Sequence, residues 1–298
     1  MKKIFTALFA ALCISGFAAE ELATMQDGWK ILSKDNVKAE KIFRAVAKNA
    51  KNNVERGTAV IGISFALRYQ RKNEEVIKEI DSFCASAPDI SKNVRAHLTL
   101  FKGNALRDLN RTSEALETYK SGWELNSSTH YSLDCAKEYI WLAADRKLND
   151  DAWKMYEISS KHPSALKNPG YLTSCAWAMW KLNKADEGMK LLDAAEKLKL
   201  SDGQKEVLHR HRGYIQRALL KDYNGAVKSF ETALELAAND FQKATLWNNI
   251  GMTFEAAKEY GKALEAYKKV GTFNAKGWFV KSAEMSAKRM EEKINSVK

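Results

Sequence analysis

The sequence has few residues that interrupt helices, with three prolines and fifteen glycines among 298 residues. Proline breaks a helix because it lacks an amide hydrogen and its ring clashes with the preceding turn. Strands would show alternating apolar and polar positions rich in β-branched residues, and the chain has little of this pattern. The scarcity of both features predicts an all-α protein.

Motifs of common enzymes are also missing. The chain has no glycine-rich phosphate loop, no nucleophile elbow and no HExxH metal motif. Among its five histidines only His209 and His211 are close in sequence, and side chains at positions i and i+2 of a helix point to different faces. We therefore expect a non-enzymatic protein that uses no cofactor and holds no metal ion.

Long apolar runs are absent except at the N-terminus. Two lysines there precede an apolar run from Ile4 to Phe17, which is followed by the small residues Ala18 and Ala19. This order predicts a secretory signal peptide at residues 1–19, and no other run approaches the about 20 residues that a membrane span needs. Cleavage would remove two lysines and lower the net charge from +11 to +9. We expect a periplasmic or secreted bacterial protein with no transmembrane segment.

Cysteine is scarce too, with four residues in all. Acylation of Cys13 in a lipoprotein is the alternative to a cleaved signal peptide, but Leu12 is bulky where a lipoprotein signal needs a small residue. The mature chain keeps an odd number, Cys84, Cys135 and Cys175, without the spacing of a zinc site. We expect them to be small buried apolar side chains.

A pair of residues four apart recurs along the mature chain, with a small or apolar residue first and a large one second. It occurs seven times, and successive first members are 37, 39, 37, 36, 38 and 37 residues apart. This period indicates a repeat protein, since each unit can bury its apolar face only against its neighbours. The pairs are Ala39/Phe43, Val76/Ile80, Ala115/Tyr119, Ala152/Tyr156, Gly188/Leu192, Ala226/Phe230 and Ala263/Tyr267.

The last repeat carries the fullest motif. It reads W-x-x-I-G-x-x-F from Trp247 to Phe254, followed after a short turn by A-x-x-x-Y from Ala263 to Tyr267. This stretch resembles a tetratricopeptide repeat, and the resemblance covers nearly all of residues 20–274. It implies an all-α, right-handed α-solenoid of about seven helix-turn-helix repeats. Residues 275–298 have apolar side chains at helical spacing, which predicts a C-terminal capping helix over the last repeat.

The resemblance also implies a small residue twelve positions before each pair, where two helices approach. Ser64, Gly103, Ala176 and Gly251 stand at this position, and Gly213 is one residue further away. The first and fourth repeats have Asp27 and Ile140 there instead, so their alignment is the weakest.

First helices line the concave groove in the family that the chain resembles, and the residue after the small position commonly points into it. This column and the positions one turn away give the candidate binding residues. They are Phe65, Arg68, Asn104, Arg107, Lys137, Trp141, Trp177, Trp180, Arg210, Tyr214, Arg217, Asn248 and Met252. Aromatic platforms among cations suit an extended anionic ligand. A register error of one residue would place the column in the core instead.

The resemblance implies a binding scaffold that mediates protein–protein contacts in the bacterial cell envelope. The partner is expected to be a protein or peptide, with acidic character. A second hypothesis is a glycan-binding solenoid, in which Trp177, Trp180 and Tyr214 stack on sugar rings while Arg210 and Arg217 hold carboxylates. A homo-oligomer is a third. Nucleic acid is not expected as a partner, because the signal peptide removes the chain from the cytoplasm.

Overall fold

The structure is a computed structural model that describes residues 24–126 and 129–296. The predicted signal peptide lies outside these residues. Within them the chain is helical, with fifteen α-helices, one short 3₁₀ turn, one π-helical turn and no strand. The prediction of an all-α protein is confirmed.

The chain divides into two compact units, one up to Val94 and one from Arg95 onward. In the first unit the helices are α1 (Met25–Ile31), α2 (Asn36–Asn49), α3 (Asn53–Tyr69) and α4 (Asn73–Ser86). The second unit starts within α5 (Lys92–Asp108). It continues with α6 (Thr112–Glu124), α7 (Tyr131–Asp145), α8 (Asn149–Ser159), α9 (Pro169–Lys181), α10 (Ala185–Glu196), α11 (Asp202–Ile215), α12 (Tyr223–Glu235), α13 (Asp240–Ala256), α14 (Tyr260–Val270) and α15 (Trp278–Ser296).

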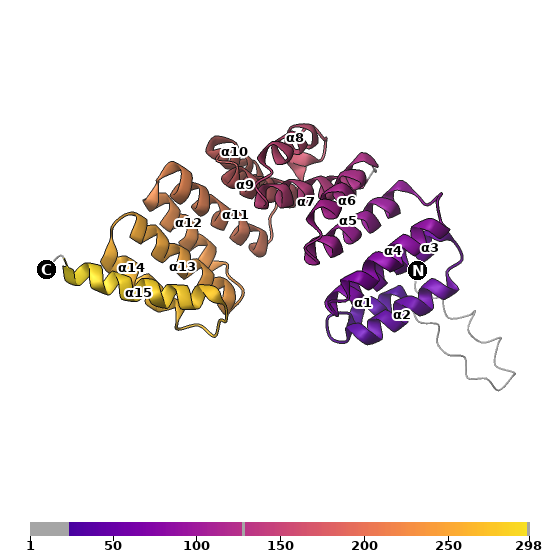
Figure 1. Cartoon of the computed structure of the whole chain (residues 1–298), viewed down its shortest axis with the longest axis horizontal. Coiled ribbons are helices and arrows are strands. Elements are labelled where there is room, and N and C mark those ends of the chain that lie inside the picture. The colour runs from indigo at the N-terminus through magenta and orange to yellow at the C-terminus, as the bar shows by residue number, and fades with distance from the viewer. Residues whose placement is uncertain (1–23, 127–128, 297–298) are drawn as a thin grey trace, which may run out of the picture. The chain divides into compact units, whose positions relative to one another are not determined.

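Helices pair as hairpins along the chain, so that odd-numbered first helices alternate with even-numbered second helices (Figure 1). Each predicted pair of residues lies on a second helix, and all fourteen side chains or glycine positions are buried. The seven pairs therefore form the contacts between first and second helices, as the period predicted. The predicted capping helix is α15, which packs on α13 and α14.

Close approach of helices explains the small residues before the pairs. A Cβ atom on Gly251 would lie 2.7 Å from the ring of Tyr267, and one on Gly213 would lie 2.6 Å from the ring of Phe230. In the first repeat the residue against Phe43 is Gly28 rather than the aligned Asp27. The alignment of that repeat was therefore wrong by one residue, since Gly28 stands eleven positions before Ala39 rather than twelve.

The sixth repeat contains one extra residue, and a π-helical turn accommodates it. Residues Gln216–Leu220 form this turn at the end of α11. A π-helix closes its hydrogen bonds over five residues instead of four, so a single turn takes up an insertion without breaking the helix. The turn explains why Gly213 lies thirteen residues before Ala226 rather than twelve.

The turns between the two helices of a repeat share one backbone feature. A residue with φ between 57° and 63° occurs five positions before the first member of each pair in repeats two to seven. The next amide usually donates to a carbonyl five residues back, as from Lys72 to Leu67 and from Glu259 to Phe254, both at 2.9 Å. This bond caps the first helix and directs the chain into the second. The residues are Arg71, Asn110, Lys147, Asn183, Lys221 and Lys258.

Candidate functional site

Four aromatic side chains of the second unit form a continuous row on first helices. Trp141 of α7 stacks on Trp177 of α9, with ring centroids 5.2 Å apart, and Trp180 stacks on Tyr214 of α11 at 5.1 Å. Trp177 and Trp180 meet edge to face at 6.2 Å. We call these residues the aromatic row. Three of them are successive members of the column predicted from sequence, so the structure brings that part of the column together.

The aromatic row lies between the core and the surface. Its four side chains are half-buried, whereas Ile140, Ala176 and Ala178 are fully buried. A rotation of about 100° per residue takes the position after the buried small residue out of the helix interface. One side of the row thus packs on the helices, and the other remains accessible to a partner.

Cations lie against the aromatic rings of the row. The Arg107 guanidinium lies 5.5 Å from the centre of the Trp141 ring, and that of Arg217 lies 5.8 Å from the Tyr214 ring. The Lys181 ammonium lies 5.1 Å from Trp177 and 4.8 Å from Trp180. Attraction between a cation and an aromatic quadrupole stabilises such contacts. Sequence reasoning missed Lys181, although it directly follows Trp180.

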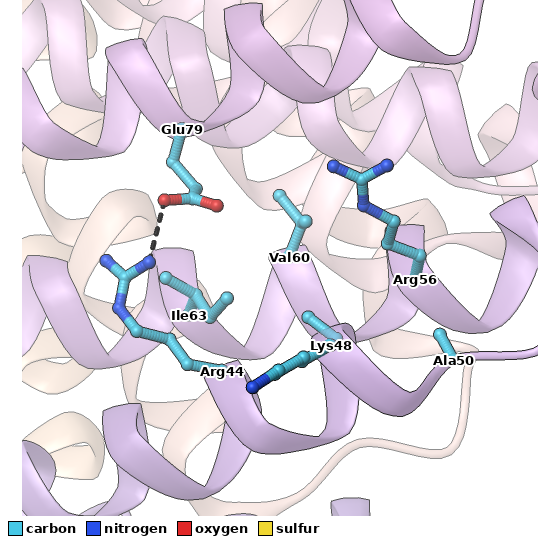
Figure 2. A pocket seen from close by; sticks show the side chains of 8 residues that line it. Arg44, Lys48, Ala50, Arg56, Val60, Ile63 and Glu79 are labelled. Atoms are coloured by element: carbon cyan, nitrogen blue, oxygen red, sulfur yellow. Dashed lines mark hydrogen bonds and ion pairs between the residues drawn. The ribbon is translucent and has the colours of Figure 1, made fainter.

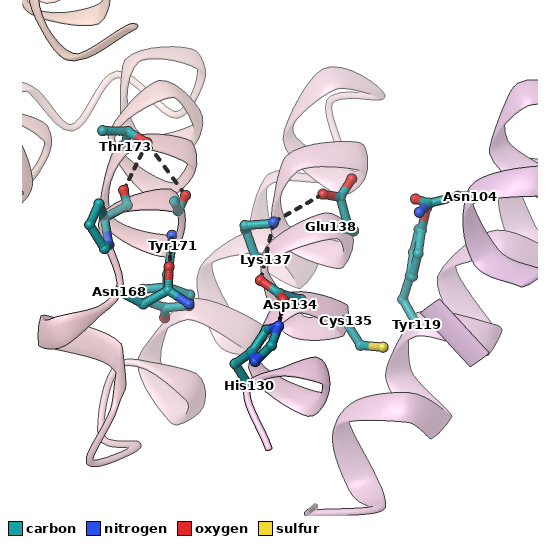
Figure 3. A network of polar contacts seen from close by, with 12 residues as sticks. Asn104, Tyr119, His130, Asp134, Cys135, Lys137, Glu138, Asn168, Tyr171 and Thr173 are labelled. Atoms are coloured by element: carbon teal, nitrogen blue, oxygen red, sulfur yellow. Dashed lines mark hydrogen bonds and ion pairs between the residues drawn. The ribbon is translucent and has the colours of Figure 1, made fainter. Parts of the chain in front are cut away.

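Carboxylates neutralise three of the predicted cations. Glu138 of α7 accepts a hydrogen bond from Arg107 at 2.6 Å and lies 3.4 Å from Lys137. Lys137 also donates to Asp134 at 3.2 Å, so that it lies between two acids (Figure 3). Although burial alone would lower the pKa of Lys137, Glu138 and Asp134 raise it above the ordinary value. These groups are held in the charged state by their own chain.

Arg210 is paired in the same way. It donates to Glu206 at 2.8 Å, and Glu206 is 1% exposed, so this carboxylate is fully enclosed. A buried carboxylate that loses its positively charged partner is strongly destabilising. Arg210 is therefore committed to holding α11 together and is a poor candidate for binding an external carboxylate.

Two cations of the row keep uncompensated charge. Arg217 donates to the carbonyl oxygen of Asn249 at 3.2 Å and to its Oδ1 at 3.1 Å, both neutral acceptors. Burial lowers the pKa of Arg217. Lys181 is exposed and makes no ion pair in the described part of the chain. Lys181 and Arg217 are the cations that remain available to an acidic partner.

The C-terminal members of the predicted site lie in a separate hollow of the second unit. Asn248 and Met252 line a cavity of about 570 Å³ together with residues of α14 and α15. Glu255 lies in the same cavity and accepts hydrogen bonds from Arg289 at 2.8 and 2.9 Å and from Tyr267 at 2.9 Å. The capping helix thus provides part of this surface, which the column analysis did not foresee.

The remaining predicted residues have other contacts in the described part of the chain. In the first unit, Phe65 and Arg68 line a cavity of about 260 Å³, and Trp29 contacts Phe65 with ring centroids 5.2 Å apart. In the second unit, Asn104 accepts a hydrogen bond from the Tyr119 hydroxyl at 2.8 Å, as Figure 3 also shows. Asn104 therefore connects the two helices of its own repeat.

Other kinds of site were sought in residues 24–126 and 129–296. These residues hold no group of three or more metal-ligating side chains. None of the helices that they form is long and apolar enough to cross a membrane. Cys135 and Cys175 are fully buried, and burial raises the pKa of both thiols.

Comparison with known proteins finds a family model that matches one of the repeats. Residues 244–271 match the model of the tetratricopeptide repeat. Similar structures include a tetratricopeptide repeat protein from Parabacteroides merdae, with 14% identity and a TM-score of 0.60 over 90% of this chain and 97% of that one. The Cut9–Hcn1 complex of the APC/C has 14% identity and a TM-score of 0.61, over 89% of this chain and 52% of that one.

The apo form of RapI is also similar, with 14% identity and a TM-score of 0.59 over 80% of this chain and 72% of that one. No curated protein sequence matches the chain. At these identities the structural likeness establishes the fold. Residues 244–271 thus match the tetratricopeptide repeat, and the chain has the all-α solenoid fold of proteins built from such repeats. Solenoids of this kind present extended surfaces for binding.

Proposed function

We propose that this chain is a non-enzymatic scaffold that binds an extended, acidic segment of a partner protein along the aromatic row. The observation that carries the proposal is the row itself, with Lys181 and Arg217 as uncompensated cations beside half-buried aromatic rings. Aromatic residues and arginine are the side chains that most often anchor protein interfaces. The row provides apolar contact area, and the two cations select for acidic residues.

The arrangement of the rings supports a protein ligand over a glycan. A sugar ring needs an open aromatic face, but Trp141, Trp177, Trp180 and Tyr214 stack on each other and on cations. Arg210, one of the two arginines expected to hold glycan carboxylates, is paired with Glu206. Ring edges and aliphatic lysine carbons are surfaces that apolar side chains of a peptide can contact.

The site of action that we propose is the bacterial cell envelope, either the periplasm or the exterior. This part of the proposal rests on the sequence of residues 1–19, with its two lysines, apolar run and small residues.

Charge reversal at the row tests the function. The mature chain and its Lys181→Glu variant would be used to capture proteins from an envelope extract of the source organism, with Lys190→Glu on α10 as the matched control. Both lysines are exposed, and neither has an ion-pair partner in the described residues. We expect Lys181→Glu to weaken capture of an identified partner about tenfold, because it repels an acidic segment. Equal loss with Lys190→Glu, or none with Lys181→Glu, would contradict the proposal.

A further inference from the structure

A cavity of about 420 Å³ opens in the first unit among α2, α3 and α4. Its charged lining residues are Arg44, Lys48, Arg56 and Glu79, so cations outnumber acids by three to one. Figure 2 shows Arg44 and Glu79 on one side of the cavity and Arg56 on the other, with Val60 and Ile63 between them. The cavity shares no residue with the aromatic row or with the column predicted from sequence.

The cations of this cavity differ in how they are compensated. Arg44 donates to Glu79 at 2.9 Å and to Glu40 at 2.8 Å, so its charge is satisfied. Lys48 and Arg56 have no carboxylate partner among the described residues. Arg56 is oriented instead by the Phe83 ring, whose centre lies 5.5 Å from the guanidinium carbon. Two positive charges are therefore available to a ligand.

The floor of the cavity is apolar. Val60 and Ile63 are almost completely covered, at 2% and 1% exposed, so the half-buried Ala47 and Ala50 provide most of the accessible aliphatic surface. A guanidinium offers a planar pair of donors that matches a carboxylate or a phosphate. An aliphatic floor gains from contact with hydrocarbon, which a bare inorganic ion lacks. The volume lies in the range of cavities that hold small molecules.

We infer that this cavity is a binding site for a small organic anion, a carboxylate attached to an apolar body. The carboxylate is held by Arg56, with Lys48 as a second positive charge of the lining. The apolar body lies against Ala47, Ala50, Val60 and Ile63. The inference goes beyond the proposed scaffold function, because it assigns a small-molecule ligand to a different surface and to the other unit.

Benzoate is a suitable probe, since benzamide has nearly the same shape without the charge. Titration into the mature chain, followed through the methyl NMR signals of Val60 and Ile63, reports on the floor of the cavity directly. We expect saturable shifts with benzoate, with a dissociation constant of about 1 mM for so small a probe, and at least about tenfold weaker binding of benzamide. Equal shifts with both probes would overturn the inference.

Single substitutions test which charged residue of the cavity binds benzoate. Arg56→Gln is expected to weaken benzoate binding about tenfold, whereas Lys78→Gln, which removes the same charge from an exposed position of α4, leaves it within about twofold. Glu79→Gln is expected to strengthen binding about threefold, because it removes the one acid of the lining. Wild-type affinity in Arg56→Gln, or weaker binding in Glu79→Gln, would contradict the assignment.

Inorganic phosphate provides the last arm of the test. Because it has no apolar body, we expect it to bind about tenfold more weakly than benzoate. If phosphate binds as tightly as benzoate, the cavity recognises charge alone, and the organic part of the inference is wrong.

Discussion

The two candidate surfaces each have one cation paired with a carboxylate and two without a carboxylate partner, but the groups around these cations differ. In the aromatic row of the second unit, Arg107 is paired with Glu138, and its positive charge is spent on contacts between helices. In the cavity of the first unit, Lys48 and Arg56 lie at an aliphatic floor without acidic partners. Arg44 of the cavity is paired with Glu79 in the same way. The row therefore surrounds its two free cations with aromatic rings, whereas the cavity places two free cations beside aliphatic side chains.

The paired cation on each surface shows why counting cations in a sequence overstates the free charge of a surface. Arg107 and Glu138 are 31 residues apart, on neighbouring first helices, and only folding brings them together. Pairing decides which cation can bind a ligand, because a charge-assisted hydrogen bond within the chain has to be broken before an external one forms.

The largest expected difference between the two surfaces is in stability. Trp177→Ala removes the centre of the aromatic row and its contacts with Trp141, Trp180 and Lys181, so we expect the free energy of unfolding to fall by about 2–3 kcal/mol. Arg56→Gln in the cavity should change it by less than about 0.5 kcal/mol. Urea unfolding followed by circular dichroism measures both. Equal effects would show that the row is no more structural than the cavity.

The next largest effect is acid sensitivity near the row. Burial, with Arg210 beside it, lowers the pKa of His211 to about 3, and its Nδ1 hydrogen is donated to the Thr173 carbonyl at 3.0 Å. The His211 side chain binds a proton near pH 6.5 when the chain is unfolded but not when it is folded. Stability is therefore complete above pH 6.5 and is lost as the pH falls toward 3, by about 2 kcal/mol at pH 5.

Unfolding at pH 7 and pH 5 measures this loss. In His211→Gln it should shrink, although His97, whose pKa burial lowers to about 4, still contributes. A pH dependence unchanged in His211→Gln would show that the buried imidazole is not the titrating group.

Removing the carboxylate from a paired cation should increase the positive charge that the row offers to a partner. Glu138→Gln leaves Arg107 and Lys137 with one fewer carboxylate, which is expected to lower stability by about 1–2 kcal/mol. The same change should tighten binding of an acidic partner about threefold, since the freed charges face it. Glu231→Gln on α12 is the control, because Glu231 is exposed and pairs with no cation in the described residues. Unchanged affinity in Glu138→Gln would mean that paired cations do not limit binding.

The smallest effect concerns a feature that both units share. Arg71 and Lys147 adopt φ angles of 61° and 62°, a conformation that costs a side chain energy and glycine none. Arg71→Gly and Lys147→Gly should each raise the free energy of unfolding by about 0.5–1 kcal/mol. Alanine at either position should give no gain, because it retains the Cβ atom. A different sign in the two units would show that their turns are not equivalent.

Much of the fold could be predicted from the sequence, because it depends on the spacing of residues that are close together in the chain. The pair Ala263/Tyr267 and its six relatives needed only their period to be placed on second helices. The position of α15 followed from its apolar face. The π-helical turn after Ile215 appeared in the sequence only as one extra residue before Ala226, without an indication of the backbone that absorbs it.

Less of the candidate site could be predicted, since it depends on contacts between helices. The column correctly grouped Trp141, Trp177 and Tyr214, whose side chains meet in the row. It could not show that the buried Glu206 would pair with Arg210. The cavity of the first unit was missed altogether, because its lining comes from three helices and follows no repeat period.

The most direct test of the scaffold function is site-specific cross-linking in living cells. A photoreactive amino acid would replace Lys181 in the aromatic row or Lys190 on α10, and mass spectrometry would identify the adducts. Our account predicts an adduct at position 181 with a partner protein, through an acidic segment, and none at position 190. Adducts at 190 alone, or an adduct at 181 only with a second copy of this chain, would contradict recognition of a partner protein by the row.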